Sequence, residues 1–211
     1  MHLREAIERV FEGKAFSYAL FYSYPGGLRF ELAESGTSIH QFRTALNKST
    51  EICEEVFRSA PGLVTCLRIR SLGNAFAERH VLRGLKRLGI SIPTDREIWV
   101  ELIDEDDWAH EGIPQYWLTI AFPTPLTLME SLLWSACATD FNIQPKADCN
   151  VYFMDLARGV MAHPYDDRGM DIVGPNHALL SEIFTTHRHY LLGYDMETML
   201  ATFAPDEAAR G

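Results

Sequence analysis

The sequence lacks the features that mark several large classes of protein. No apolar run approaches transmembrane length, and the opening MHLREAIERVF has no apolar signal-peptide core. The cysteines form no CxxC pair and no metal-ligand spacing with histidine; they are Cys53, Cys66, Cys137 and Cys149. We therefore expect reduced, buried thiols, no metal or other cofactor, no membrane partner and a cytoplasmic location.

Familiar catalytic signatures are also missing from the chain. It contains no P-loop, no dinucleotide fingerprint, no HExxH and no nucleophile elbow. Basic residues are too few for a phosphate-backbone binder: 19 Lys and Arg stand against 29 Asp and Glu, for a net charge of -10. These absences argue against an enzyme of a familiar class and against a nucleic-acid partner, and the acidic balance suits a basic partner.

The length and composition of the chain are those of an ordinary globular protein. The 211 residues are 47% hydrophobic and 23% charged, which suffices for a buried core without disulfides. We expect one domain over residues 1–211, with 1–145 and 146–204 as possible subdomains on either side of a loop at 141–149. The class that we expect is α+β: a largely antiparallel sheet with helices packed on one face.

Periodicity and turn residues place the elements. Residues 16–23 and 28–32 flank Pro25-Gly26-Gly27 and are predicted to be the two strands of a hairpin. Further strands are expected at 63–69, 98–103 and 116–122. Helical spacing of apolar residues predicts helices at 2–12, 37–57, 78–88, 126–139, 175–189 and 196–203.

The stretch Asn150–Gly174 is predicted to be a β-meander followed by the C-terminal helices. Two tight turns divide it, Ala157-Arg158-Gly159 and Asp166-Asp167-Arg168-Gly169. We expect Gly169 to hold a positive φ and Arg168 to pair with a carboxylate of the same chain, which would cost a few kcal/mol to break if the pair is buried.

Two polar clusters are candidate sites. Asp104-Glu105-Asp106-Asp107, with Trp108 at its edge, is the densest charge run; it is either a solvated loop or a negative patch for a cationic partner. It lacks the spacing of a calcium loop.

The second cluster comprises His163, Asp166, Asp167 and Asp171 around one turn. These residues could form a metal or acid/base site. The alternative, which we favour, is a structural turn in which aspartates accept backbone amides and Arg168 pairs with a carboxylate.

Four segments resemble a known family. Residues 162–172, AHPYDDRGMDI, resemble the DDRG block of the bacterial domain-of-unknown-function 3885 family, and 190–195, YLLGYD, is similar to its second block, with Tyr190 where Trp is frequent. Residues 27–32 and 52–57 are similar to segments of longer members. The resemblance implies a small cytoplasmic protein of the kind that serves as the immunity partner of a bacterial toxin.

Together, resemblance and charge suggest a binding protein rather than an enzyme. We expect it to neutralise a cognate toxin encoded nearby, a basic nuclease-type effector, through the acidic run and Trp108. The alternative is an enzyme or small-ligand-binding protein with its site around the Asp166–Gly169 turn. The oligomeric state does not follow from the sequence.

Overall fold

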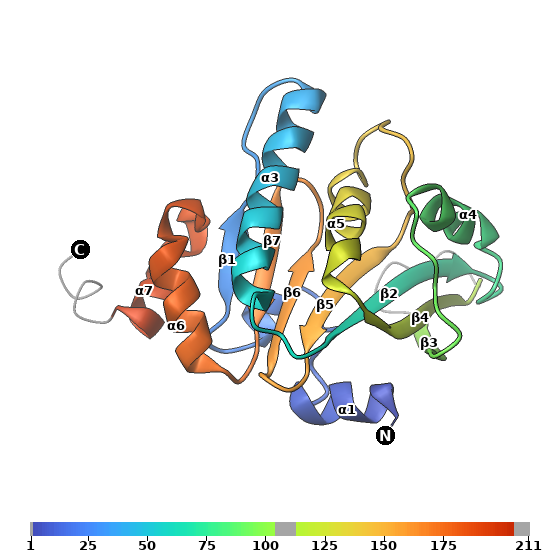
Figure 1. Ribbon diagram of the computed structural model, residues 1–211, viewed down its shortest axis with the longest axis horizontal. Coiled ribbons are helices and arrows are strands. Elements are labelled where there is room, and N and C mark those ends of the chain that lie inside the picture. Colours follow the sequence, from blue (N-terminus) through green and yellow to red (C-terminus); the bar gives the residue numbers. More distant parts are fainter. Residues whose placement is uncertain (1, 104–112, 205–211) are drawn as a thin grey trace.

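A computed structural model describes residues 2–103 and 113–204. Within this part of the chain, seven strands form one sheet in the order β1-β7-β6-β5-β2-β4-β3, and every neighbouring pair is antiparallel. With the surrounding helices, this confirms the expected α+β class (Figure 1). The first strand pairs with the last, so segments from both ends of the chain lie side by side in the sheet.

The elements have the following bounds. The strands are β1 (Leu28–Glu31), β2 (Leu63–Leu72), β3 (Glu97–Ile103), β4 (Gln115–Thr124), β5 (Asn150–Asp155), β6 (Val160–Pro164) and β7 (Gly169–Val173). The α-helices are α1 (Leu3–Val10), α2 (Leu20–Ser23), α3 (Ser38–Phe57), α4 (Arg79–Arg87), α5 (Met129–Cys137), α6 (His177–Thr186) and α7 (Met196–Phe203). Short 3-10 turns are η1 (Leu126–Leu128), η2 (Arg188–Tyr190) and η3 (Gly193–Asp195).

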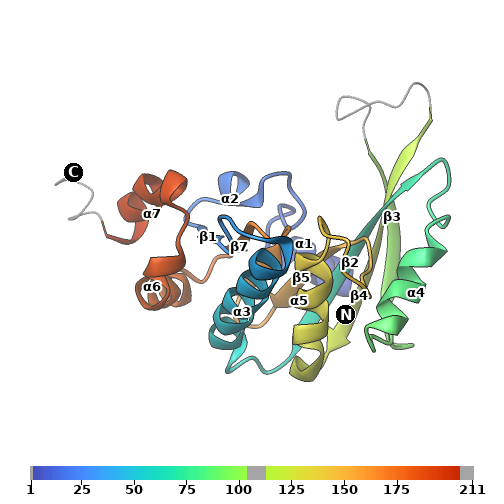
Figure 2. The same cartoon turned by 90° about the horizontal axis from the view of Figure 1, so that it is seen from above.

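The larger helices cover one face of the sheet and enclose the main core (Figures 1 and 2). Helix α3 begins where the Thr37 side chain accepts the His40 amide, and it buries Phe42, Ala45, Ile52 and Val56 at helical spacing. Helices α4, α5 and α6 add apolar residues to the same core, against the inward side chains of the strands. None of the described helices is long and apolar enough to cross a bilayer.

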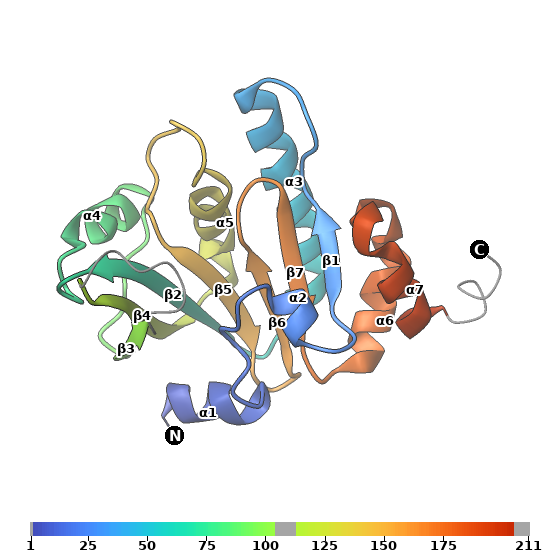
Figure 3. The same cartoon turned by 180° about the vertical axis from the view of Figure 1, so that it is seen from behind.

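The N-terminal segment packs against the opposite face and forms a second core cluster there. In Figure 3, α2 lies in front of the sheet beside β7, and α1 lies at the lower ends of the strands. The prediction of a strand at 16–23 in a hairpin with β1 is wrong. Leu20 and Phe21 are both buried although they are consecutive, so the segment lacks the alternation of a half-buried strand. Ala19 takes a left-handed φ of 47, and residues 20–23 form the short helix α2. The amide of Phe21 donates to the Asp171 carboxylate instead of to a strand.

The predicted meander is confirmed by β5, β6 and β7. Its first turn is fixed by Asp155, whose carboxylate accepts the amides of Ala157 and Arg158 at 3.0 Å, and Gly159 takes the left-handed φ of 64. The meander thereby places the residues of its second turn next to β1, at one end of the sheet.

The outer edges of the sheet differ. Beside β1, Leu191 bridges Phe30, and the amide of Leu192 donates to the Arg29 carbonyl at 2.9 Å. The outer edge of β3 has no strand partner within the described part of the chain. We refer to these as the β1 end and the β3 end.

Candidate functional site

Three of the four segments that resemble the family meet at the β1 end. Arg29 of β1 donates from Nε to Asp171 Oδ1 at 2.7 Å and from Nη2 to Asp171 Oδ2 at 2.9 Å. Its Nη1 lies 3.5 Å from Asp195 Oδ2, and the Tyr22 hydroxyl donates to Asp195 Oδ1 at 2.8 Å. These four residues, with Tyr165, form what we call the Arg29 cluster.

Burial makes the charges of the Arg29 cluster interdependent. The side chains of Asp171, Asp195 and Arg29 are 1%, 5% and 12% exposed, and the guanidinium lies over the rings of Tyr22 and Tyr165 at 4.7 and 5.8 Å. The hydrogen bonds to Asp171 raise the pKa of Arg29. Burial raises the pKa of Tyr165 to about 12, so its hydroxyl stays protonated.

His163 lies beside the Arg29 cluster, on the same face of the sheet. It is the cross-strand neighbour of Asp171, stacks on Tyr152 at 4.0 Å between ring centroids, and is 9% exposed. Its Nδ1 lies 2.9 Å from the Val151 carbonyl, which assigns the proton to Nδ1 and leaves Nε2 unprotonated. Burial lowers its pKa, so the ring is neutral near pH 7.

The polar groups of the Asp166–Gly169 turn form hydrogen bonds mainly with one another. Asp166 Oδ1 accepts the amides of Arg168 and Gly169 at 2.8 and 3.2 Å, and its Oδ2 accepts Arg168 Nε at 2.9 Å. Asp167 is 5% exposed, and its pKa is raised by burial and by Asp166. The candidate metal or acid/base site comprised His163, Asp166, Asp167 and Asp171. Among these four described residues, His163 and Asp171 are direct cross-strand neighbours, whereas Asp166 and Asp167 lie in the turn.

Two expectations about this turn need correction. Gly169 does not have a positive φ; it is required because a Cβ there would lie 1.8 Å from the Tyr165 hydroxyl oxygen. Arg168 pairs with Asp166 as expected, but its side chain is 72% exposed. We therefore expect Arg168→Ala to lower the free energy of unfolding by at most ~1 kcal/mol in chemical denaturation. A loss of several kcal/mol would contradict this.

Other chemistries have little support among the described residues. They include no group of three or more His, Cys, Asp or Glu that could hold a metal ion. All four thiols are buried, and burial raises the pKa of Cys137 and Cys149 to about 12, which keeps them protonated and unreactive. The predicted toxin-binding residues Asp104, Glu105, Asp106, Asp107 and Trp108 lie outside the described residues.

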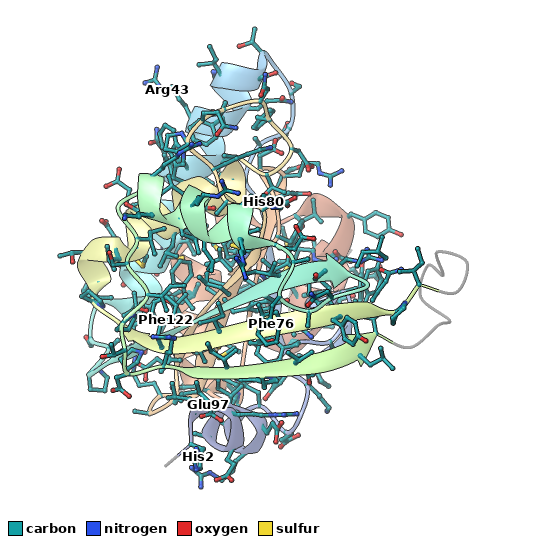
Figure 4. The ribbon with its side chains drawn as sticks, turned by 90° about the vertical axis from the view of Figure 1, so that its right-hand side faces the viewer. His2, Arg43, Phe76, His80, Glu97 and Phe122 are labelled. Atoms are coloured by element: carbon teal, nitrogen blue, oxygen red, sulfur yellow. The ribbon has the colours of Figure 1, made fainter. Side chains whose placement is uncertain are left out.

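The β3 end presents apolar side chains to solvent. Ile98, Val100 and Leu102 alternate along β3 and are 44%, 37% and 61% exposed, whereas their neighbours Ile120 and Leu118 on β4 are buried. We call these three residues the β3 row. On the other face of β3, Trp99 is buried and Glu97 accepts the Arg4 amide, so α1 closes that side (Figure 4).

Sequence reasoning missed Arg29 and Asp195 as members of a site, and it missed the β3 row. The first two lie within segments quoted for the family resemblance, and their meeting could not be read from spacing alone. The alternation of Ile98, Val100 and Leu102 with charged and aromatic residues predicts a one-sided strand but not which side faces solvent.

Comparisons with known proteins give one finding about kinship. A family model described as "Domain of unknown function (DUF3885)" matches residues 3–195, nearly the whole chain. No curated protein and no solved structure matches this chain.

Proposed function

The chain belongs to the family described as a domain of unknown function (DUF3885), and we propose that it is an immunity protein, which neutralises a cognate bacterial toxin by direct binding. The observation that carries the proposal is the exposed β3 row on an outermost strand whose outer edge has no strand partner among the described residues. Monomeric proteins seldom leave such a row of aliphatic side chains exposed unless it meets a partner.

Charge favours a basic partner for this surface. The net charge is -10, and the run Asp104-Glu105-Asp106-Asp107 follows β3 directly in the sequence. A binding surface commonly joins an apolar centre to a charged rim. Apolar contacts with the β3 row would slow dissociation, and the acidic run would speed association with a basic toxin such as a nuclease.

The β1 end favours binding over catalysis in a different way. The carboxylates of Asp171 and Asp166 are engaged within the chain by Arg29, Arg168 and backbone amides. Groups held in this way stabilise the fold and have little capacity left for a substrate. This supports a role in which the fold presents a surface and performs no chemistry of its own.

The test uses the product of the open reading frame immediately upstream of the gene for this chain, which the proposal expects to be the toxin. Association and dissociation rates are measured by surface-binding kinetics at low and high ionic strength. We expect Ile98→Thr/Leu102→Thr to weaken binding by at least ~10-fold, mainly through faster dissociation. Asp106→Lys/Asp107→Lys should slow association strongly at low salt and less at high salt.

Ile39→Thr is the matched control, because Ile39 is an exposed aliphatic residue on α3. It should bind as the wild type does. If the neighbouring product does not bind, the immunity role is wrong. If it binds but neither double variant changes a rate constant, the interface lies elsewhere on the protein.

A further inference from the structure

A pocket of about 470 Å³ lies where β2 extends beyond β5. The β2–β5 ladder ends at Arg68 and Asn150, while β2 continues to Leu72 paired only with β4. The notch left beside β2 is lined by Arg68, Arg70, Ser71, Leu72, Glu78, Gln115, Trp117, Asp148, Cys149 and Asn150. Its volume is in the range of pockets that hold small molecules.

The wall formed by residues 148–150 is held by the segment before it. Trp134 Nε1 donates to the Pro145 carbonyl at 2.9 Å, and the Ser135 hydroxyl donates to the Ala147 carbonyl at 3.0 Å. Both side chains come from α5, which belongs to the main core. The opposite wall belongs to β2 and β4, which pair over ten residues each. Both walls are therefore anchored before any ligand arrives.

Arg68 is the buried cation of the pocket. Its side chain is 8% exposed and lies between the rings of Phe16 and Trp117, 4.6 Å from each centroid. Nη2 lies 3.2 Å from Glu101, and Nη1 donates to the Phe16 carbonyl at 3.3 Å. The buried Nε has no hydrogen-bond partner within the described part of the chain. A buried donor without an acceptor is costly unless a ligand supplies one.

Two further charges at the pocket have no counterion among the residues that the structure describes. The Arg70 guanidinium donates to the neutral amide oxygen of Gln115, at 2.8 Å from Nε, and forms no ion pair with a carboxylate of residues 2–103 or 113–204. Asp148 likewise forms no ion pair within those residues, whereas the Glu78 carboxylate lies 3.1 Å from His80. Arg70 and Asp148 both line the pocket without pairing with each other.

We propose that this pocket binds a free amino acid, whose carboxylate pairs with Arg70 and whose ammonium group pairs with Asp148. A zwitterion supplies an opposite charge to each of the two side chains at once, and a guanidinium matches a carboxylate in bidentate geometry. A phosphate fits less well, because Glu78 and Asp148 would repel its second charge. The remaining volume, beside Leu72 and the Trp117 ring, accommodates the ligand side chain.

This site is independent of the proposed immunity function and is tested without a toxin. Isothermal titration calorimetry of the full chain with each standard L-amino acid is the measurement, with acetate and methylamine as probes that carry one charge each. At least one amino acid should bind saturably, and acetate and methylamine should bind at least ~10-fold more weakly.

Substitutions then identify the two contacts. Arg70→Gln and Asp148→Asn should each weaken amino-acid binding by at least ~10-fold. Arg96→Gln and Asp95→Asn, at exposed positions away from the pocket lining, should leave it unchanged. Equal melting temperatures show that the variants fold.

Three outcomes overturn the proposal. One is that no amino acid binds. The second is that acetate or methylamine binds as tightly as the amino acid. The third is that binding survives either Arg70→Gln or Asp148→Asn, since the ligand would then not bridge the two charges.

Discussion

The β1 end and the β3 end of the sheet differ in what their polar and apolar groups contact. At the β1 end, Leu191 and Leu192 cover the edge strand and Arg29 engages two buried carboxylates. At the β3 end, the outer edge of β3 has no strand partner among residues 2–103 and 113–204. Two strands inward, on β2, Arg70 donates to the amide oxygen of Gln115 and forms no ion pair within those residues. Groups satisfied within the chain stabilise the fold, whereas our two binding proposals concern the exposed β3 row and Arg70.

The comparison also separates two kinds of arginine. Arg29 and Arg70 both lie on the same face of the sheet as His163, but Arg29 is 12% exposed and doubly hydrogen-bonded to a carboxylate, whereas Arg70 is exposed. Removal of the first should leave a buried charge, and removal of the second should not. The predictions below test this difference, from the largest expected effect to the smallest.

Arg29→Leu should lower the free energy of unfolding by ~3–5 kcal/mol, because it leaves the buried carboxylate of Asp171 without its ion pair. Chemical denaturation followed by circular dichroism measures the change. Arg29→Leu/Asp171→Leu should recover part of the loss, since Asp195 is then the one carboxylate of the Arg29 cluster that has lost its cation. A loss below ~1 kcal/mol for the single variant would show that the pair does not hold the β1 end together.

Gly169→Ala should cost ~1–3 kcal/mol, because the new methyl group would overlap the Tyr165 hydroxyl and displace the ring from Arg29. The same denaturation experiment applies. Gly193→Ala is the control, since a Cβ there meets no atom within 4 Å. In a Tyr165→Ala background the Gly169→Ala cost should disappear. Persistence of the cost in that background would point to the backbone instead of the ring.

Acid should destabilise the fold around His163, which lies beside the Arg29 cluster. Burial lowers the pKa of His163 in the folded protein, so its contribution to stability is present above its unfolded pKa of ~6.5 and is lost as pH falls through the folded pKa. Melting temperature should therefore fall on acidification below pH ~6.5. His163→Gln should flatten this dependence, and His80→Gln, at an exposed position, should not. An unchanged slope in His163→Gln would assign the effect to His187, whose pKa burial also lowers.

Val100→Thr should change the free energy of unfolding by less than ~0.5 kcal/mol, because Val100 is 37% exposed on the outermost strand β3. Thermal and chemical unfolding measure it, with Val151→Thr as the buried counterpart. Val151 is fully buried on β5, so that substitution should cost clearly more. Equal losses at the two positions would mean that the β3 row is covered within the protein.

The elements governed by local rules could be predicted from the sequence. The meander follows from alternation and from turns such as Ala157-Arg158-Gly159, where aspartate and glycine fix the backbone locally. Helix α3 follows from its apolar spacing and its Thr37 cap. The fold class needs little more than the number and order of such elements, and it is confirmed.

What could not be predicted depends on contacts between distant residues. Arg29 and Asp171 are 142 positions apart, and Tyr22 and Asp195 are 173 positions apart. No local sequence pattern therefore predicts the Arg29 cluster. Another long-range contact explains why the predicted strand at residues 16–23 is wrong. The Asp171 carboxylate accepts the Phe21 amide across 150 positions, which no local sequence pattern indicates. The role of Gly169 depends on the position of a neighbouring ring and not on its own φ.

The pairing of the first strand with the last has a consequence for the order of synthesis. A ribosome makes β2, β3 and β4 early, and these can pair as soon as residue 124 is available. β1 cannot pair until residues 169–173 exist, and its outer edge stays uncovered until 191–192 follow. The nascent chain therefore carries β1 unpaired through most of its translation. Pairing between such distant segments slows folding, and the unpaired strand edge can aggregate in the meantime.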